Sequence, residues 1–575
     1  MTSPWTSLHI FFHADALATD RFLVEGVLPA VSGLARQGGL QSWFFIRYWE
    51  GGPHIRLRLR GCTPEGVKQV EEALTGYLQK QPALPQPLQA REYYRTFTSD
   101  SDPVATYGWH TDRTIVPIAY VPELDRYGGE EGMAVSEELF SGSSQVALAL
   151  VRTVPEHGKR MVVLVDLLLA MLEGMGLSRL EAVDWLRSTV NAWPRFFLIS
   201  QAQVVERCQL AEKDFLSKQP VWMERLPKVR KSLEAGGAQP SLFAVWAQQV
   251  RGAMQRYREL ESQAKLTMKP VDILRSQLHM LHNRLGLTIP EECHVAWLAS
   301  LILAGTDPAL PGTVDGAEAS DRRFHEQSKL SRHVRAQMGP ADTEFSDEPP
   351  APLRWPGREP VALPAQGPER LQLSLGEALL ARRSRYGGYG GTVALEELAT
   401  LLQLSAGYVR TMEVPRPQQP LKVRLRAYPS AGARYPLRTY VLARRVTGLE
   451  PGLYRYDDLA HALQWVAPAP DAALIRSCSP FLQQEAQPAI DATDAPLWLF
   501  TTADLTYQRE RYGPRALRLV LLECGHLAQN LCLAATAMNL SCITVGGFYD
   551  DLLNQVLYLD GVNQAVFYML PVGRR

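Results

Sequence analysis

The sequence predicts an α+β protein of two domains, and three observations support this fold class. At 575 residues, the chain is too long for a single hydrophobic core. Its first half opens on strand-like runs and continues with helical periodicity, whereas its final part alternates strands with helices. Between them, proline, glycine and acidic residues dominate much of 307–370. We therefore expect domains at 1–306 and 371–575, joined by a linker and domain-edge segment.

The first domain is predicted to start with strands and to become largely helical. Leu8–Phe12 and Trp43–Tyr48 are rich in aromatic and β-branched residues, as strands are. A helical pattern begins at Glu130. Long amphipathic stretches then cover 160–175, 180–215, 241–263 and 271–285. Pro349–Pro352, in the following linker, excludes a helix interior or a central strand there.

The second domain is predicted to be α/β. Helical patterns occupy Leu373–Ala381 and Leu395–Leu404. A long, mostly apolar helix is predicted over Leu517–Asn539, and its composition indicates burial on most sides. The predicted strands are Thr439–Ala443, Leu497–Thr502, Ser541–Gly547 and Ala565–Pro571.

The bulk composition excludes several classes of function. Sixty basic residues balance sixty acidic ones, so no overall field favours a nucleic acid or a membrane surface. Seven scattered cysteines without a CxxC pair indicate neither a disulfide framework nor a metal site, and fit a reducing cytoplasm. The apolar run Met161–Met175 contains Asp166 and Glu173 and is too short to span a bilayer. Any recognition of anions must therefore be local.

An arginine-rich strand is the first candidate site. In the segment 51–60, a strand places His54, Arg56, Arg58 and Arg60 on one face and three aliphatic residues on the other. Such a face is either solvated or built to meet anions. Arg126 lies in a turn-rich loop just before a helix. His279 and His282 follow at helical spacing beside the leucine stripe of the last helix, where a buried structural histidine is the alternative.

Three separated motifs of this half resemble the elimination domain of lantibiotic dehydratases. They are the Trp43–Arg60 strands, the Pro122–Gly129 loop and the His279–Leu285 helix, and the resemblance covers roughly 5–305. It implies β-elimination of glutamate from glutamylated Ser or Thr, leaving dehydroamino acids. By the same resemblance the functional residues are Arg56, Arg58, Arg126 and His279. Arginine forks suit a leaving carboxylate, and histidine suits proton transfer near neutrality. A related branch forms a pyridine ring by cycloaddition and is not expected to need these arginines.

A second arginine cluster, Arg382, Arg383, Ser384 and Arg385, directly follows a helical pattern. Guanidinium and hydroxyl groups together suit a phosphate, although such a run is usually solvated surface charge. Three other features occur with it: a tight turn at Tyr428–Pro436, paired glycines after a strand at 544–548, and Arg574 near the C-terminus. Paired glycines allow backbone to approach a flat ring closely.

These features resemble the nitroreductase-like flavoenzymes, and in particular azoline dehydrogenases, from about Phe324 to the C-terminus. The resemblance implies FMN as the cofactor and oxidation of thiazolines to thiazoles. By resemblance, its phosphate is held by Arg382, Arg383, Ser384 and Arg574. The turn Pro429, Ser430, Ala431 and Gly432 flanks the flavin, and Gly546 and Gly547 place a backbone N–H near flavin N5.

The predicted base of this reaction departs from the family pattern. The family usually has a Lys-Tyr pair, whereas this chain has Arg511 and Tyr512. Arginine does not act as a base, since its pKa exceeds about 12, but it can lower the pKa of a neighbouring tyrosine. Tyr512 is therefore the candidate, with a packing tyrosine as the alternative. His526, in the predicted long helix, is interpreted as structural.

Together the two resemblances indicate the bifunctional enzymes of lactazole-type thiopeptide pathways. We expect a precursor peptide as substrate, with a separate tRNA-dependent glutamylation enzyme and an azoline-forming cyclodehydratase supplying the modified peptide. A homodimer is expected by resemblance. The alternative is an FMN-dependent azoline dehydrogenase whose N-terminal domain only binds peptide. A third option makes the flavin domain a reductase or an oxidase of other peptide bonds.

Overall fold

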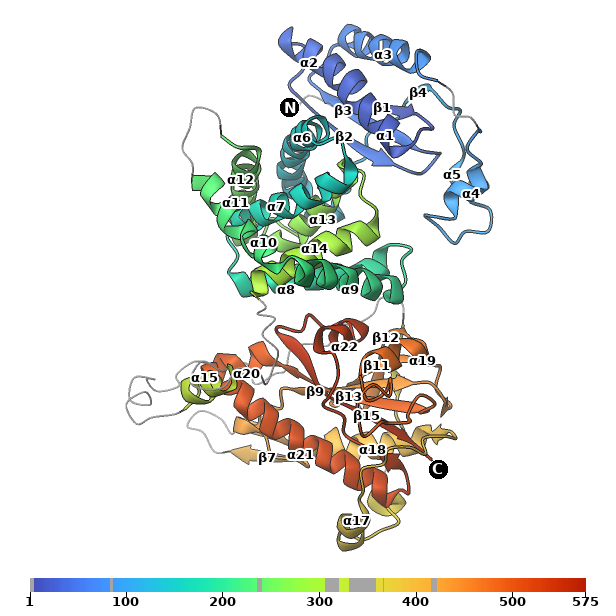
Figure 1. The fold of residues 1–575 in the computed structure, drawn as a ribbon, viewed down its shortest axis with the longest axis vertical. Helices are drawn as coiled ribbons and strands as arrows, with labels where there is room; N and C mark the ends of the chain where they lie inside the picture. The colour runs from blue at the N-terminus through green and yellow to red at the C-terminus, as the bar shows by residue number, and fades with distance from the viewer. Residues whose placement is uncertain are drawn as a thin grey trace. The chain divides into compact units, whose positions relative to one another are not determined.

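The computed structural model describes residues 5–82, 86–234, 240–305, 320–329, 358–365, 367–414 and 421–574. The chain forms two compact units, Met1–Thr306 and Asp307–Arg575, which are drawn in Figure 1. Each unit is described by itself below. Most of the predicted linker, including Pro349–Pro352, lies outside the described residues.

The first unit opens on an antiparallel sheet of four described strands in the order β2-β3-β1-β4. The strands are β1 (Trp5–Phe11), β2 (Ser42–Tyr48), β3 (His54–Arg60) and β4 (Thr114–Pro117). Strand β3 therefore lies between β1 and β2. Its register pairs Arg56 with His9 and Ile46, and Arg58 with Ser7 and Phe44. Directly opposed residues share a face, so the predicted alternation of basic and aliphatic residues is present.

Helices make up the rest of this unit (Figure 1). They are α1 (Ala16–Arg21), η1 (Phe22–Val27), α2 (Leu28–Arg36), α3 (Pro64–Gln79), α4 (Ala90–Tyr94), α5 (Pro103–Tyr107), η2 (Asp125–Tyr127), α6 (Glu130–Thr153), α7 (His157–Met175), α8 (Arg179–Phe196), α9 (Gln201–Ser217), α10 (Gln219–Met223), α11 (Arg225–Glu234), α12 (Leu242–Ser262), α13 (Pro270–Arg284) and α14 (Ile289–Ala304). The stretch 180–215, predicted as continuous, is two helices, because Phe197 leaves helical geometry and Ser200 caps α9.

Helix α13 is fastened to the edge strand β2. The backbone N–H of Arg47 donates to Oδ1 of Asn283 at 2.9 Å, and Nδ2 of Asn283 donates back to the Arg47 carbonyl at 2.9 Å. Nε of Arg47 also donates to the carbonyl of Arg284 at 3.0 Å. These bonds fix the helix that carries His279 relative to the strand beside the arginine face.

The Arg47 side chain is neutralised by a buried carboxylate. Asp20 accepts hydrogen bonds from Arg47 and, at 2.7 Å, from Nη2 of Arg160 on α7. All three side chains are largely buried. This cluster joins α1, β2 and α7.

In the second unit, seven described strands form a sheet in the order β14-β15-β13-β9-β11-β12-β5, and its neighbours pair antiparallel. These strands are β5 (Val361–Ala362), β9 (Leu437–Ala443), β11 (Gly452–Asp457), β12 (Ala462–Pro468), β13 (Leu497–Asp504), β14 (Ser541–Cys542) and β15 (Gln564–Gly573). The predicted strand Ser541–Gly547 is wrong beyond Cys542, since the chain there leaves the ladder except for a bridge from Val545 to Met569. The shorter strands are β6 (Val393–Ala394), β7 (Tyr408–Val414), β8 (Leu421–Arg426) and β10 (Val446–Thr447).

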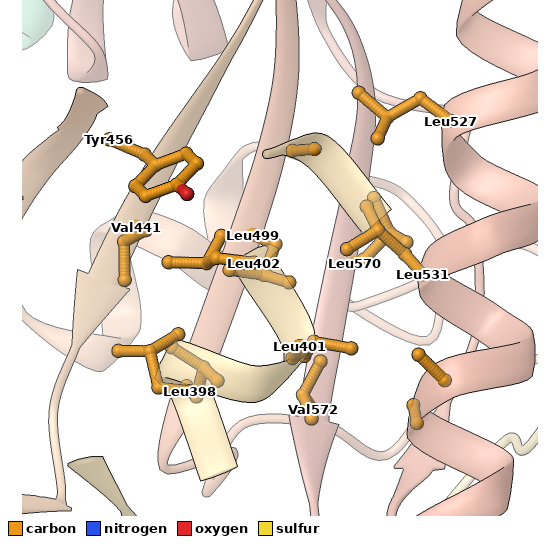
Figure 2. Packing of buried hydrophobic residues seen from close by; sticks show 14 of the residues in the cluster. Leu398, Leu401, Leu402, Val441, Tyr456, Leu499, Leu527, Leu531, Leu570 and Val572 are labelled. Carbon is orange, nitrogen blue, oxygen red and sulfur yellow. The ribbon is translucent and has the colours of Figure 1, made fainter. Parts of the chain in front are cut away.

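The helices of this unit are α15 (Ser320–Gln327), η3 (Pro368–Arg370), α17 (Leu375–Ala381), α18 (Leu395–Ala406), η4 (Ala431–Ala433), α19 (Ala472–Ser477), α20 (Leu505–Tyr512), η5 (Gly513–Arg515), α21 (Ala516–Ala537) and α22 (Asp550–Val556). Leucines of α18 and α21 pack on the central strands, as Figure 2 shows for Leu401, Leu499 and Leu531. Helix α21 also exposes Leu521, Leu522 and His526, so the expected burial is confined to its sheet-facing side.

By length and hydropathy, the helical stretch Leu505–Ala537 could cross a membrane, and half of its most apolar window is buried inside the protein. Helices α13 and α14 reach the length and hydropathy of a membrane span only when they are taken together, and they are bent by 120° relative to each other. Core helices of water-soluble proteins pass this test too. In this unit, α21 packs its buried side into the core of the sheet.

Replacing Asp20 by Asn tests the charge cluster. The substitution leaves two buried guanidinium groups without their shared negative charge, and loss of one partner from a buried ion pair costs about 3–5 kcal/mol. We expect D20N to lower the free energy of unfolding by that amount in urea titrations. Glu156→Gln, which removes an exposed carboxylate paired with Lys159, serves as the control and should change it by less than about 0.5 kcal/mol. Equal stability of the two variants would contradict the role of Asp20.

Candidate functional sites

Arg58 is a buried cation whose charge is not balanced by a carboxylate. Its side chain is 5% exposed, and its Nε and Nη1 have no hydrogen-bond partner among the described residues. The guanidinium lies 5.1 Å from the centre of the Tyr120 ring. Burial, reinforced by the charge of Arg56, lowers the pKa of Arg58 to about 10, which still leaves it charged near neutrality. A buried cation of this kind gains most from an anionic ligand.

Arg56 is oriented by its neighbours on the same face. Its guanidinium lies 3.3 Å from the centre of the Tyr48 ring and 3.9 Å from Glu50. Nε of Arg56 donates to Nε2 of His54 at 3.2 Å, while Nδ1 of His54 donates to the Gly52 carbonyl at 2.8 Å. Burial lowers the pKa of His54 to about 3, so the ring is neutral and can accept this bond. His54 therefore positions Arg56.

Arg126, on η2, links the loop to helix α13. It donates from Nη1 to Glu123 at 3.1 Å and from Nε to Oγ of Ser276 at 3.2 Å. Ser276 and His279 are three residues apart on α13 and therefore lie on the same side of the helix. The structure thus brings Arg126 within one helical turn of His279.

His279 is held by a carboxylate that the sequence analysis missed. Its Nδ1 lies 2.9 Å from Oε1 of Glu292, and Nδ1 of His282 lies 3.4 Å from Oε2 of the same residue. Glu292 is 1% exposed. Burial opposes its ionisation, but the two imidazoles hold its pKa below the ordinary value. The only sequence signal was a glutamate in the apolar pattern of α14.

Aromatic side chains pack against the His279 ring. The ring centres of Trp193 and Phe197 lie 5.7 Å and 4.8 Å from it. With Nδ1 turned to Glu292, Nε2 is the nitrogen left for proton exchange with a ligand. His282 lies deeper, at 1% exposure, and both the structural and the proton-transferring interpretations of His279 stay predictions.

In the second unit, the predicted phosphate ligands divide between two cavities. Residues 382–385 are not helical, so successive side chains point to different sides. Arg382 and Ser384 line a cavity of about 170 Å³ with Gln529, Thr544 and Tyr568.

The other cavity, of about 360 Å³, contains Arg383, Arg385 and Arg574. Arg383 donates to the carbonyls of Leu380 and of Arg382, the residue that follows α17. Arg574 pairs with Glu397. Cys542 lines both cavities, so they adjoin. The four predicted phosphate ligands thus line two adjoining cavities.

The predicted flavin-flanking turn packs on the predicted catalytic pair. Gly432 has φ +64°, and a Cβ there would lie 2.5 Å from the Tyr512 hydroxyl and 3.6 Å from the guanidinium of Arg511. Glycine is therefore required both by the backbone and by Tyr512. The turn itself comprises Pro429, Ser430 and the start of η4 at Ala431.

Ser430 ties this turn to a second residue that the sequence analysis missed. Its hydroxyl accepts the Tyr435 N–H at 2.9 Å and donates to Oε2 of Glu523 at 2.6 Å. Gly546 lies beside Tyr568, which lines the smaller cavity, whereas Gly547 is approached by the ring of Phe481. Phe481 fills the space that a side chain at position 547 would need, and the expected N–H contact with flavin N5 stays a prediction.

Two protein-family models match the chain. Residues 5–303 match the lantibiotic biosynthesis dehydratase C-terminal model, and residues 381–574 match the nitroreductase family model. The chain is 31% identical over 210 residues to the putative nitroreductase MJ1384 of Methanocaldococcus jannaschii, spanning 36% of this chain and 96% of that protein.

Two further similarities involve proteins of peptide biosynthesis. The trifolitoxin-processing protein TfxB of Rhizobium leguminosarum bv. trifolii is 28% identical over 187 residues, 32% of this chain and 48% of its own length. The solved structure of the pyridine synthase TbtD from thiomuracin biosynthesis superposes with a TM-score of 0.43 at 22% identity, covering 52% of this chain and 98% of TbtD. This chain therefore spans about half of TfxB.

Proposed function

This chain belongs to the lantibiotic biosynthesis dehydratase C-terminal family in its first unit and to the nitroreductase family in its second, and from this membership we propose that it is a bifunctional enzyme maturing a ribosomally made thiopeptide precursor. The first activity is β-elimination of glutamate from glutamylated Ser or Thr. The second is FMN-dependent oxidation of thiazolines to thiazoles.

The observation that carries the elimination activity is the buried, unneutralised guanidinium of Arg58 beside Arg56. Arginine binds a carboxylate through two parallel N–H bonds, and this attraction grows as the leaving glutamate develops its negative charge. Two adjacent guanidiniums repel each other without an anion, which is why the charge of Arg56 lowers the pKa of Arg58. The face therefore favours an anionic leaving group over a neutral one.

His279 is the proton-transfer group of this proposal. In the elimination, the Cα–H bond breaks and its electron pair forms the Cα=Cβ bond, while the Cβ–O bond breaks and glutamate leaves with the electron pair of that bond. Glu292 holds Nδ1, so Nε2 of His279 receives the proton. Arg126, bonded to Ser276 on the same helix, brings a third cation to this region.

The residues lining the smaller cavity suit the binding of FMN. Arg382 and Ser384 offer a guanidinium and a hydroxyl to a phosphate, and Thr544, Gln529 and Tyr568 offer polar groups to the remainder of the molecule. When bound, FMN supplies a two-electron acceptor. Tyr512 then faces the flavin-flanking turn, where it can meet a ring proton of the substrate. Arg574, paired with Glu397 in the neighbouring cavity, lies at the edge of this site.

The chemistry of the two substrates implies partners. A glutamyl ester must be made by a tRNA-dependent glutamylation enzyme, and an azoline by a cyclodehydratase, before this enzyme acts. We further propose a homodimer formed through the second unit. Leu375, Leu379 and Leu380 of the short helix α17 are exposed, the last at 77%, which is unusual for a surface without a partner.

Arg58→Ala tests the elimination activity. Loss of a charge-stabilising donor typically lowers rates by about 10²–10³-fold, and we expect that loss in the release of glutamate from a chemically glutamylated precursor peptide, followed by mass spectrometry. Arg60→Ala is the matched control, since Arg60 lies on the same strand face but contacts Glu137 and Trp5. Glutamate release by R58A at the wild-type rate, or none by the wild type, would instead favour a peptide-binding module.

Loss of Arg382 should weaken flavin binding. The purified protein is expected to show flavin absorption bands and to convert a thiazoline peptide to a product lighter by two hydrogens. The double variant R382A/S384A removes both phosphate donors of the smaller cavity, so its dissociation constant for FMN should rise at least 100-fold in fluorescence titrations, on the order of 3 kcal/mol for two charge-assisted bonds. An unchanged affinity for FMN would instead indicate that the phosphate binds in the cavity of Arg383 and Arg574.

The proposed dimer is tested by mass in solution. Leu379→Glu with Leu380→Glu places two charges on the exposed face of α17, and the desolvation of these charges should prevent association. Light scattering is expected to give a dimer for the wild type and a monomer for the variant. A monomeric wild type at micromolar concentration would reject the proposal.

A further inference from the structure

Glu523 is a buried carboxyl group that the two proposed reactions do not yet use. It lies on α21 and is 2% exposed. Its Oε2 accepts the hydrogen bond from Ser430, and its Oε1 is buried without a hydrogen-bond partner in the part of the chain that the structure describes. A carboxyl group with one oxygen free of bonds has room for one more proton without breaking any existing contact.

The charged groups around Glu523 do not neutralise it. Arg426 on β8 pairs with Asp458 and donates to the Tyr428 hydroxyl, and Nη1 of Arg438 on β9 donates to two backbone carbonyls. The other titratable neighbours are Tyr428, Tyr435 and, on its own helix, Cys524. Burial raises the pKa of Glu523 from its ordinary value of 4.5 to about 7, and the two arginines only moderate this shift.

The Ser430 hydroxyl connects Glu523 to the flavin-flanking turn. It accepts the Tyr435 N–H and donates to Glu523, so its hydrogen points along the path toward the carboxylate. Two residues further along the same turn, Gly432 lies against the Tyr512 hydroxyl. The same turn thus contacts Tyr512 at Gly432 and a buried carboxylate through the Ser430 hydroxyl.

Oxidation of a thiazoline needs a proton acceptor as well as an electron acceptor. One ring hydrogen must leave with its electron pair, which FMN would accept when bound, and a second C–H bond loses a proton and leaves its electron pair in the new ring double bond. Arg511, at the position beside Tyr512, cannot take that proton because a guanidinium stays charged. Tyr512 remains a candidate, and the turn that contacts it offers a second route for the proton through Ser430.

We propose that Glu523 is the terminal proton acceptor of the oxidation site and acts through the Ser430 hydroxyl. This proposal rests on the proposed azoline oxidation. In the transfer, the ring C–H bond breaks and an O–H bond forms at Ser430, while the original Ser430 O–H bond breaks and its proton passes to Glu523. The carboxylate becomes neutral, and no further reactant is needed. Glu523 is thus a positioning and proton-holding residue, because it does not touch the ring itself.

Glu523→Gln tests the transfer in a single turnover. Flavin-loaded protein is mixed anaerobically with a thiazoline peptide, and loss of the flavin absorption is followed against pH. General base catalysis contributes about 10²–10⁴-fold, so the rate of E523Q should fall by that factor. The wild-type rate should decrease as pH falls through about 7, where the carboxylate takes up a proton, and E523Q should lack this decrease. Glu523→Asp, which keeps the carboxyl group, should restore part of the rate.

Glu413→Gln is the matched control. Glu413 lies on β7 in the same unit and is exposed beside Lys422, so the same amide substitution there should leave the rate and its pH dependence unchanged. Ser430→Ala removes the bridging hydroxyl while retaining Glu523, and it should lose as much rate as E523Q does. If E523Q is isolated without flavin, the rate of S430A alone tests whether the proton passes through the hydroxyl to Glu523.

Thermal unfolding of the flavin-free protein gives a readout independent of activity. Since the pKa of Glu523 is about 7 when folded and 4.5 otherwise, the folded protein binds more protons in that window. Stability from this group is therefore lost as pH rises from about 4.5 through 7. The midpoint of E523Q should rise relative to the wild type across this window, and that of E413Q should not.

The possible outcomes distinguish failure of the proposed azoline oxidation from failure of the proposed role of Glu523. A wild type that binds no flavin, or whose flavin is not reduced by the peptide, overturns the azoline oxidation itself. A wild type that is reduced at a rate independent of pH, or S430A and E523Q variants as fast as the wild type, overturns only the role of Glu523. An unchanged stability difference between E523Q and the wild type across the window also overturns it.

Discussion

The first unit depends on the charge cluster around Asp20. A strand residue such as Arg47 can be buried only because this carboxylate and a second arginine share the neutralisation. With its side chain fixed there, the backbone of Arg47 is free to bind Asn283, and helix α13 is held against the sheet. The arginine face of β3 and His279 of α13 are thereby held at fixed positions relative to each other. Residues on separate elements need such fixed positions to act on one substrate.

The two proposed sites differ from the rest of the protein in how their buried charges are balanced. Arg47 and Arg160 are satisfied by Asp20, and Arg426 by Asp458, so these cations serve the fold. Arg58 lacks such a partner, and Glu523 shares its surroundings with arginines already engaged elsewhere. A charge left incompletely balanced in a folded protein costs stability, and it is retained where a ligand or a transferred proton completes the balance.

The sequence predicts local features well and distant ones poorly. The alternation of β3 follows from its period of two, and the helices over 270–284 and 395–406 follow from their leucine spacing. The break after Phe196 was missed because its residues are as apolar as the helices on either side. Glu292 and Glu523 were missed because their roles depend on burial and on partners 13 and 93 residues away. Residues 382–385 line two cavities because their backbone is not helical, and the composition of this segment does not reveal that.

Replacement of the usual lysine by Arg511 is understandable if proton acceptance has moved to another group. A lysine can take a proton when its pKa is lowered, whereas an arginine supplies only a fixed positive charge. Beside Tyr512 that charge can meet a negative charge developing on the substrate, but it does not remove the proton from the site. In the proposed reaction, Glu523 would complete the transfer, since its raised pKa of about 7 lets it accept a proton at neutral pH and release it again. Gly432, which lies against the phenol, and Ser430, which donates to the carboxylate, belong to the same turn.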